Sequence, residues 1–182
     1  MNVPNWLAVA RIVLTPVVMT FVLLSGRMNG AFGIAAAVFT VAALTDFADG
    51  YLARRWKITT VLGAFLDSVA DKVLVTGSLL VLIEVGRAWS WAAFIIIGRE
   101  LAVMGLRGVA ALEKSAVPPS LWGKGKTFFQ FLAIGLAMVR PNTEWGPYFL
   151  DEWVMLVAVI FTLVSAWDYF RGYGSALRIR QD

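Results

Sequence analysis

Long apolar segments constrain the fold of this chain more than any other feature. A helix needs about 20 mostly apolar residues to cross the hydrocarbon core of a bilayer. Six segments of roughly that length are separated by glycine, proline and charged residues; they span residues 7–25, 31–53, 61–85, 89–110, 122–140 and 150–171. Strands with open edges leave backbone groups unpaired in lipid, and these segments are too long and uniformly apolar for barrel strands. We therefore predict an all-α integral membrane protein with six transmembrane helices, forming one domain over residues 1–182.

The N-terminal residues are open to two interpretations. Pro4, Asn5 and Trp6 precede the first apolar run, so residues 2–11 are compatible with a short interfacial helix ahead of the first span. Arg11 lies inside that run, where it either extends toward the interface or faces an active site. The start lacks the basic region and small-residue cleavage site of a signal peptide, so we expect it to belong to the mature protein.

The distribution of Lys and Arg predicts the orientation of the helices. With a cytoplasmic N-terminus, most of these residues fall on the cytoplasmic side, and Arg27, Arg87 and Arg140 fall on the opposite side. Positive charge is enriched in cytoplasmic loops, so both termini are expected to face the cytoplasm. The net charge of +4 is consistent with this role. Since no aromatic and basic pattern accompanies it, we expect no nucleic-acid partner.

The sequence contains neither cysteine nor histidine. Their absence excludes disulfides, thiolate nucleophiles and zinc sites with thiolate or imidazole ligands. It also excludes mechanisms that need a histidine base or a phosphohistidine, as phospholipase-D-like lipid synthases do. Carboxylates, Lys, Arg and hydroxyl groups remain to carry any chemistry.

Four aspartates within the apolar segments are the strongest functional signal. Asp46 and Asp49 are three residues apart, and Asp67 and Asp71 are four apart, so each pair shares a helix face. The short connection between their segments predicts antiparallel neighbours whose aspartates point into one cavity. Four carboxylates repel each other strongly in a low dielectric. Their hard oxygen ligands favour Mg²⁺ or Mn²⁺, and two ions would balance the charge better than one.

Small residues beside the aspartates leave room for a ligand. Gly50, Ala53 and Gly63 lack bulk where a cavity would admit a nucleotide, and Arg54 can reach a diphosphate. Two structural alternatives remain open. Gly50 is also explained by close helix packing, and the aspartates could form structural ion pairs with Lys72, Arg54 and Arg55.

The aspartates belong to a longer pattern. It reads Asp46-Phe-Ala-Asp49-Gly50-Tyr-Leu-Ala53-Arg54, then eight residues, then Gly63-Ala-Phe-Leu-Asp67-Ser-Val-Ala-Asp71. This resembles the signature of the CDP-alcohol phosphotransferase family, with every fixed position present. The resemblance implies two divalent metals, a polar cavity facing the cytoplasm, a homodimer and a location in the bacterial inner membrane. Carried over, Asp46, Asp49 and Asp67 hold metals, and Asp71 is a ligand or the general base. The residues implied to line the CDP-diacylglycerol site are Asp49, Gly50, Ala53, Arg54 and Gly63.

Beyond the signature, the chain resembles the branch of this family whose acceptor is glycerol-3-phosphate. The resemblance includes Pro4-Asn5-Trp6-Leu7 and Trp122-Gly123-Lys124-Gly125-Lys126-Thr127. It implies transfer of the phosphatidyl group from CDP-diacylglycerol to glycerol-3-phosphate, with release of CMP, in phospholipid biosynthesis.

Fixed cations are needed to bind an acceptor that carries a phosphate dianion. Arg99 and Arg107 are eight residues apart on one face of the fourth segment, and Lys124 and Lys126 begin the fifth. We predict that these four side chains bind glycerol-3-phosphate. Alternatively, Arg99 pairs with Glu100 or a distant acid, and the two lysines are topological anchors at the cytoplasmic surface.

Other acceptors and one other class of protein remain as alternatives. Serine carries no phosphate and needs fewer cations, inositol phosphate would fit the same cations, and phosphatidylglycerol would need a second groove open to lipid. A small cation transporter is the alternative from another class. The sequence lacks the repeats or paired broken helices that transporters often show, and the acids cluster near one membrane face.

Overall fold

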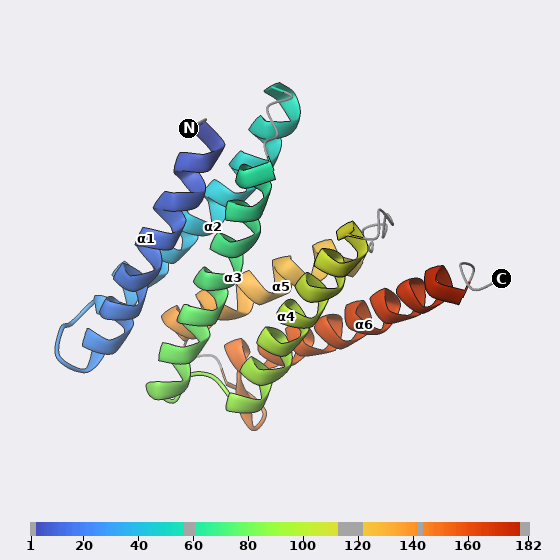
Figure 1. Cartoon of the computed structure of the whole chain (residues 1–182). Coiled ribbons are helices and arrows are strands. Elements are labelled where there is room, and N and C mark those ends of the chain that lie inside the picture. The colour runs from blue at the N-terminus through green and yellow to red at the C-terminus, as the bar shows by residue number, and fades with distance from the viewer. Residues whose placement is uncertain (1–2, 57–60, 113–121, 142–143, 179–182) are drawn as a thin grey trace.

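The chain forms long helices that alternate in direction along the sequence (Figure 1). The structure is a computed structural model that describes the backbone of residues 3–56, 61–112, 122–141 and 144–178. Side chains are described for residues 5–45, 63, 65–110, 125–141 and 146–171. Within these ranges the elements are α1 (Val3–Leu23), the 3-10 helix η1 (Leu24–Gly26), α2 (Ala31–Trp56), α3 (Val61–Glu84), α4 (Ser90–Leu112), α5 (Trp122–Val139), β1 (Glu144–Trp145), β2 (Tyr148–Phe149) and α6 (Leu150–Arg178).

Each predicted apolar segment corresponds to one of the six α-helices described, so the all-α class is confirmed. α1 is continuous from Val3, so the residues considered for a separate interfacial helix form its first turns. Two helices contain stretches long and apolar enough to cross a bilayer, Asn5–Gly26 and Leu150–Arg171. Shorter apolar stretches lie at Ala31–Thr45 and Gly125–Val139. The number of transmembrane helices therefore stays a prediction.

A small antiparallel hairpin, which the sequence analysis did not predict, precedes α6. Glu144 pairs with Phe149 and Trp145 with Tyr148. Gly146, the first of the two turn residues, has a φ of 73°. Glycine adopts positive φ without steric cost and is the usual residue there in a type II′ hairpin. Strands of two residues are too short to give an alternating sequence pattern.

α1 packs against both α2 and α3, α5 pairs with α6, and α4 packs on α6. Among the described residues, α2 and α3 contact each other directly over only a short stretch, so α1 largely connects them. Buried apolar side chains from all six helices form a continuous core; they include Val18, Phe39, Leu74, Leu79, Ile96, Ile134, Met138 and Met155.

α1 and α3 approach each other closely at Gly77. A Cβ atom at this position would lie 2.7 Å from Thr15 Cγ2 and 3.0 Å from Met19 Sδ, both on α1. Favourable carbon contacts are about 3.5–4.0 Å long. The Thr15 hydroxyl donates to the Arg11 carbonyl at 3.0 Å, which restricts its rotation. The absence of a side chain at Gly77 therefore sets the spacing of the two helices that carry Arg11 and the α3 aspartates.

The junction between α3 and α4 is closed by a Schellman motif at Gly86. Gly86, with a φ of 70°, donates from its N–H to Ile83 O at 3.0 Å, and Arg87 donates to Leu82 O at 2.7 Å. The Arg87 guanidinium then donates through Nη1 to the last carbonyls of α5, at Ala137 and Met138. Burial, together with nearby Arg140, lowers the pKa of Arg87 from its usual value, and Asp151 opposes this effect.

Acidic side chains stabilise the first turn of α6. Arg140 donates to Asp151 Oδ2 from Nε at 3.2 Å and from Nη2 at 3.0 Å. Glu152 Oε2 accepts from the Phe149 N–H at 2.9 Å, as the glutamate of a capping box does. Acidic groups also interact favourably with the helix dipole at this end. These contacts hold the start of α6, whose later turns face the candidate site.

Candidate active site

Asp67 and Asp71 lie one turn apart on the same face of α3. The Asp67 side chain is 50% exposed, and Asp71 is partly buried with its Oδ1 inaccessible to solvent. Neighbours at this spacing have Cβ atoms about 5–6 Å apart. α3 thus presents two carboxylates, one more buried than the other, to a shared region.

Arg11 reaches this region from α1. Its side chain is fully buried, and its Nη1 lies 3.4 Å from Asp67 Oδ1. Arg11 is therefore buried against an acidic side chain of α3, which agrees with the interpretation that it faces the predicted site. The contact is long and involves one oxygen of a half-exposed carboxylate. Arg11 therefore offsets part of the acidic charge without enclosing Asp67.

The remaining candidate ligands belong to a helix whose end is described by its backbone alone. α2 is helical to Trp56. The side chains on α2 that were predicted to bind metal or CDP-diacylglycerol lie outside the described residues: Asp46, Asp49, Gly50, Ala53 and Arg54. Gly63 lies in the first turn of α3 and is partly buried. Within the described side chains no three acidic groups converge. Asp67 and Asp71 are half of the predicted metal-binding set, and their hard oxygen donors fit Mg²⁺ or Mn²⁺.

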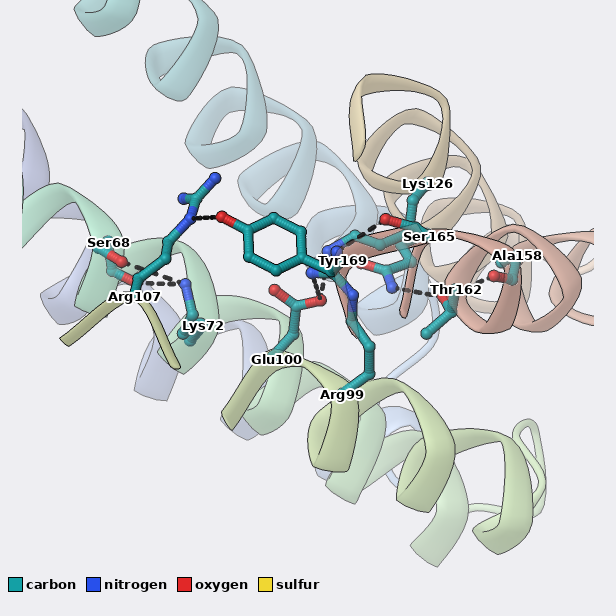
Figure 2. Close-up of polar contacts among 11 residues, drawn as sticks. Ser68, Lys72, Arg99, Glu100, Arg107, Lys126, Ala158, Thr162, Ser165 and Tyr169 are labelled. Carbon is teal, nitrogen blue, oxygen red and sulfur yellow. Dashed lines mark hydrogen bonds and ion pairs between the residues drawn. The ribbon is translucent and has the colours of Figure 1, made fainter. Parts of the chain in front are cut away.

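Lys72 follows the acidic pair but does not pair with it among the described contacts. Its ammonium donates to the Ser68 carbonyl at 3.1 Å and to Ser68 Oγ at 3.2 Å (Figure 2). The structural alternative in which Lys72 neutralises the aspartates by direct ion pairs is therefore not supported by the described geometry.

A buried cluster of charged side chains joins α4, α5 and α6 (Figure 2). Glu100 Oε1 accepts from Arg99 Nη1 at 3.2 Å and also from Lys126 Nζ. The side chains of Arg99, Lys126 and Glu100 are 9%, 6% and 12% exposed. Arg99 Nη2 also donates to Ser165 Oγ at 2.7 Å. The pairing of Arg99 with Glu100 is thus observed, and the interpretation of Lys126 as a surface anchor is wrong because this lysine points into the bundle.

Arg107 lies farther along the same face of α4 and is more exposed. Its Nε donates to Tyr169 Oη at 2.6 Å, and its Cζ is 5.4 Å from the centre of the tyrosine ring. The other two guanidinium nitrogens point away from that ring in Figure 2. Ser165 and Tyr169 are four residues apart on α6, so this helix holds both arginines in place. The side chain of Lys124 lies outside the described residues.

The cation cluster and the acidic face of α3 belong to one region. Lys126 lies within electrostatic range of Asp71, and Glu100 within range of Lys72. α3 also packs against both α4 and α5, so the acidic face of α3 and the cations of α4 and α5 are neighbours in the bundle.

The hydroxyl groups of α6 were not among the predicted site residues. Gln130 on α5 donates to Thr162 Oγ1 at 2.9 Å, and Thr162 donates to the Ala158 carbonyl at 2.6 Å. Thr162, Ser165 and Tyr169 are spaced by three and four residues, which places them on one helix face. Three hydroxyl-bearing residues at this spacing in an otherwise apolar segment are the sequence signal by which this polar face of α6 could have been predicted.

A comparison with protein families assigns the arrangement to a known group. The family model described as CDP-alcohol phosphatidyltransferase matches residues 1–164. The chain belongs to this family. Among similar curated proteins, the CDP-diacylglycerol--glycerol-3-phosphate 3-phosphatidyltransferase of Bacillus subtilis is 36% identical over 97% of both chains. The protein of that name from Haemophilus influenzae is 37% identical over 92% of this chain and 89% of its own. A probable phosphatidylglycerophosphate synthase of Mycobacterium tuberculosis is 37% identical over 92% of this chain and 79% of its own.

Proposed function

We propose that this enzyme transfers the phosphatidyl group of CDP-diacylglycerol to glycerol-3-phosphate, giving phosphatidylglycerophosphate and CMP in phospholipid biosynthesis. Family membership supports the reaction type. The names of relatives that are 36% and 37% identical over most of this chain support both substrates. The structural observation that carries the proposal is the buried cation cluster next to the acidic face of α3.

The charges of this cluster match a phosphate group. The cluster of Arg99, Lys126 and Glu100 carries a net charge of +1, and the more exposed Arg107 on the same face of α4 brings the total of these four side chains to +2. A phosphate monoester is close to a dianion at neutral pH. Serine has no phosphate to balance these cations. Inositol phosphate carries a phosphate and would balance them equally well. The preference for glycerol-3-phosphate over inositol phosphate therefore comes from the names of the relatives and not from the charge.

The proposed chemistry assigns one proton transfer to Asp71. The acceptor hydroxyl oxygen forms a bond to the phosphatidyl phosphorus, the bond from that phosphorus to CMP breaks, and the hydroxyl proton moves to the Asp71 carboxylate. Asp46, Asp49, Asp67 and Asp71 would hold divalent metal ions, which would neutralise the charge on the departing CMP. Gly50, Ala53, Arg54 and Gly63 would line the donor site. Arg99, Arg107, Lys124 and Lys126 orient the acceptor through its phosphate.

The proposal includes a membrane location with six spans. All six helices expose large apolar side chains, among them Val13, Leu44, Leu80, Phe94, Leu132 and Leu163. Apolar surface on this scale is rare on water-soluble monomers and suits contact with lipid. The Lys and Arg distribution supports both termini and the active site on the cytoplasmic side of a bacterial inner membrane. The family resemblance supports a homodimer and two metal ions, Mg²⁺ or Mn²⁺.

An acceptor panel tests the function. Purified protein in detergent is incubated with CDP-diacylglycerol and Mg²⁺ or Mn²⁺, and glycerol-3-phosphate, serine, inositol phosphate and phosphatidylglycerol are offered separately. We expect a lipid product and CMP only when glycerol-3-phosphate is the acceptor offered. A product formed preferentially with another acceptor would overturn the assignment while preserving the reaction type.

A further inference from the structure

Glu100 connects two buried cations of the candidate site, Arg99 on α4 and Lys126 on α5. Its Oε1 accepts from both Arg99 Nη1 and Lys126 Nζ, so one carboxylate oxygen sets the position of a side chain on its own helix and of one on α5. Glu100 is 12% exposed. Its contacts lie on the side of α4 that faces α5 and α6 (Figure 2).

The two cations need such a partner. A buried charge without a counter-ion is strongly disfavoured, and two like charges close together in a low dielectric repel each other. Lysine in particular has a flexible stem and a compact charge that adopts many orientations when nothing fixes it. Without Glu100, Arg99 and Lys126 would separate and lose their common orientation.

The guanidinium of Arg99 keeps donor capacity while it is held. Nη1 is taken by Glu100 and Nη2 by Ser165, but the buried Nε makes no hydrogen bond within the described residues. A nine-tenths buried arginine with an unused donor is expected to meet an acceptor group in the functional complex. This unused donor, which lies beside two fixed cations, points to a ligand.

We infer that Glu100 is a positioning residue of the acceptor site, which rests on the proposed function. Glu100 holds Arg99 and Lys126 in the geometry that receives the acceptor phosphate, and it does not itself touch the acceptor. Its negative charge also keeps the net charge of Arg99, Lys126, Arg107 and Glu100 at +2, matched to a phosphate dianion. The acceptor therefore finds the two cations already fixed, and less conformational entropy is lost when it binds.

The test compares kinetics of Glu100→Gln with those of the unchanged protein. Glutamine keeps the size of the side chain but removes the charge that holds both cations. Loss of charge-assisted hydrogen bonds of this kind should raise the KM for glycerol-3-phosphate by about tenfold or more. The KM for CDP-diacylglycerol should stay unchanged. Glu100→Asp keeps the charge at a shorter reach and should give an intermediate acceptor KM.

Glu84→Gln is the matched control, because it makes the same chemical change at an exposed position near the far end of α3. It should alter neither KM. The thermal midpoint of each variant in detergent is measured with and without glycerol-3-phosphate, and the stabilisation by this ligand should shrink for Glu100→Gln. A purely structural role would lower the midpoint and leave the acceptor KM unchanged.

Several outcomes overturn the inference. An unchanged acceptor KM, or an equal rise in both KM values, removes Glu100 from the acceptor site. A fall in the acceptor KM shows that Glu100 competes with the phosphate instead of preparing its site. If Glu100→Gln cannot be purified, Glu100→Asp is judged by the same criteria. Activity of the unchanged protein with glycerol-3-phosphate tests the function separately, so the two failures are distinguishable.

Discussion

Replacing Gly77 by alanine should force α1 and α3 apart. The new methyl group would lie 2.7 Å from Thr15 Cγ2 and 3.0 Å from Met19 Sδ. The methionine sulfur can move, but Thr15 is restricted by its hydrogen bond to the Arg11 carbonyl. Overpacking of this kind costs about 1–3 kcal/mol. The better helix propensity of alanine returns about 0.5–1 kcal/mol, so we expect a net loss of up to about 2.5 kcal/mol in the free energy of unfolding.

Thermal unfolding in detergent measures this effect. Gly135→Ala on α5 is the control, because a Cβ atom there meets nothing within 4 Å. The midpoint should fall for Gly77→Ala and stay level or rise for Gly135→Ala. Thr15→Ser removes the clashing Cγ2 but keeps the hydroxyl, so adding it to Gly77→Ala should recover part of the lost stability. Equal midpoints for the two alanine variants, or no recovery by Thr15→Ser, would refute the idea that this contact sets the spacing of α1 and α3.

Three further predictions concern the site and the end of the bundle opposite to it. Asp71→Asn should abolish turnover while the thermal midpoint stays near that of the unchanged protein; near-normal activity would exclude Asp71 as the base. Arg107→Ala should raise the KM for glycerol-3-phosphate and leave the KM for CDP-diacylglycerol unchanged. Tyr169→Phe should have a smaller effect of the same kind, because it removes only the hydrogen bond of 2.6 Å that holds Arg107. An unchanged acceptor KM in Arg107→Ala would remove it from the pocket. Arg87→Met should lower the thermal midpoint, because the carbonyls of Ala137 and Met138 lose their donor, at a cost of about 1–3 kcal/mol; full stability would show that this cap is dispensable.

The helices were predictable because each is a nearly continuous apolar run, and a span of about 20 such residues has few other stable structures in lipid. Their ends agree within a few residues except at α6, which continues to Arg178. The last turns of α6 contain Arg171, Gly172 and Gly174, which mark the end of an apolar run but do not terminate a helix.

The role of Arg11 could not be decided from the sequence. An arginine within an apolar segment looks the same whether it extends to the interface or is buried against an acid on another helix. The choice depends on how α1 packs on α3, where Gly77 allows the close approach. That contact involves residues more than 50 positions apart, and no local pattern reports it.

The hydrogen-bond partners of Arg99 and Glu100 could not be predicted from the sequence. Adjacent residues on a helix point in different directions, so the sequence does not show whether Arg99 and Glu100 pair. In the structure they do pair, and each has a second partner, Ser165 for Arg99 and Lys126 for Glu100. Those partners come from α5 and α6, and tertiary packing alone brings them to α4.

Stoichiometric release of CMP is the most direct test of the central claim, that carboxylates and cations of this site transfer a phosphatidyl group to glycerol-3-phosphate. Purified protein with CDP-diacylglycerol is assayed for CMP and lipid product, with and without glycerol-3-phosphate, and with Mg²⁺, Mn²⁺ or a chelator. We expect equal amounts of CMP and phosphatidylglycerophosphate, both requiring a divalent metal and the acceptor. CMP release that persists in the chelator, or that proceeds equally without glycerol-3-phosphate, would contradict the central claim.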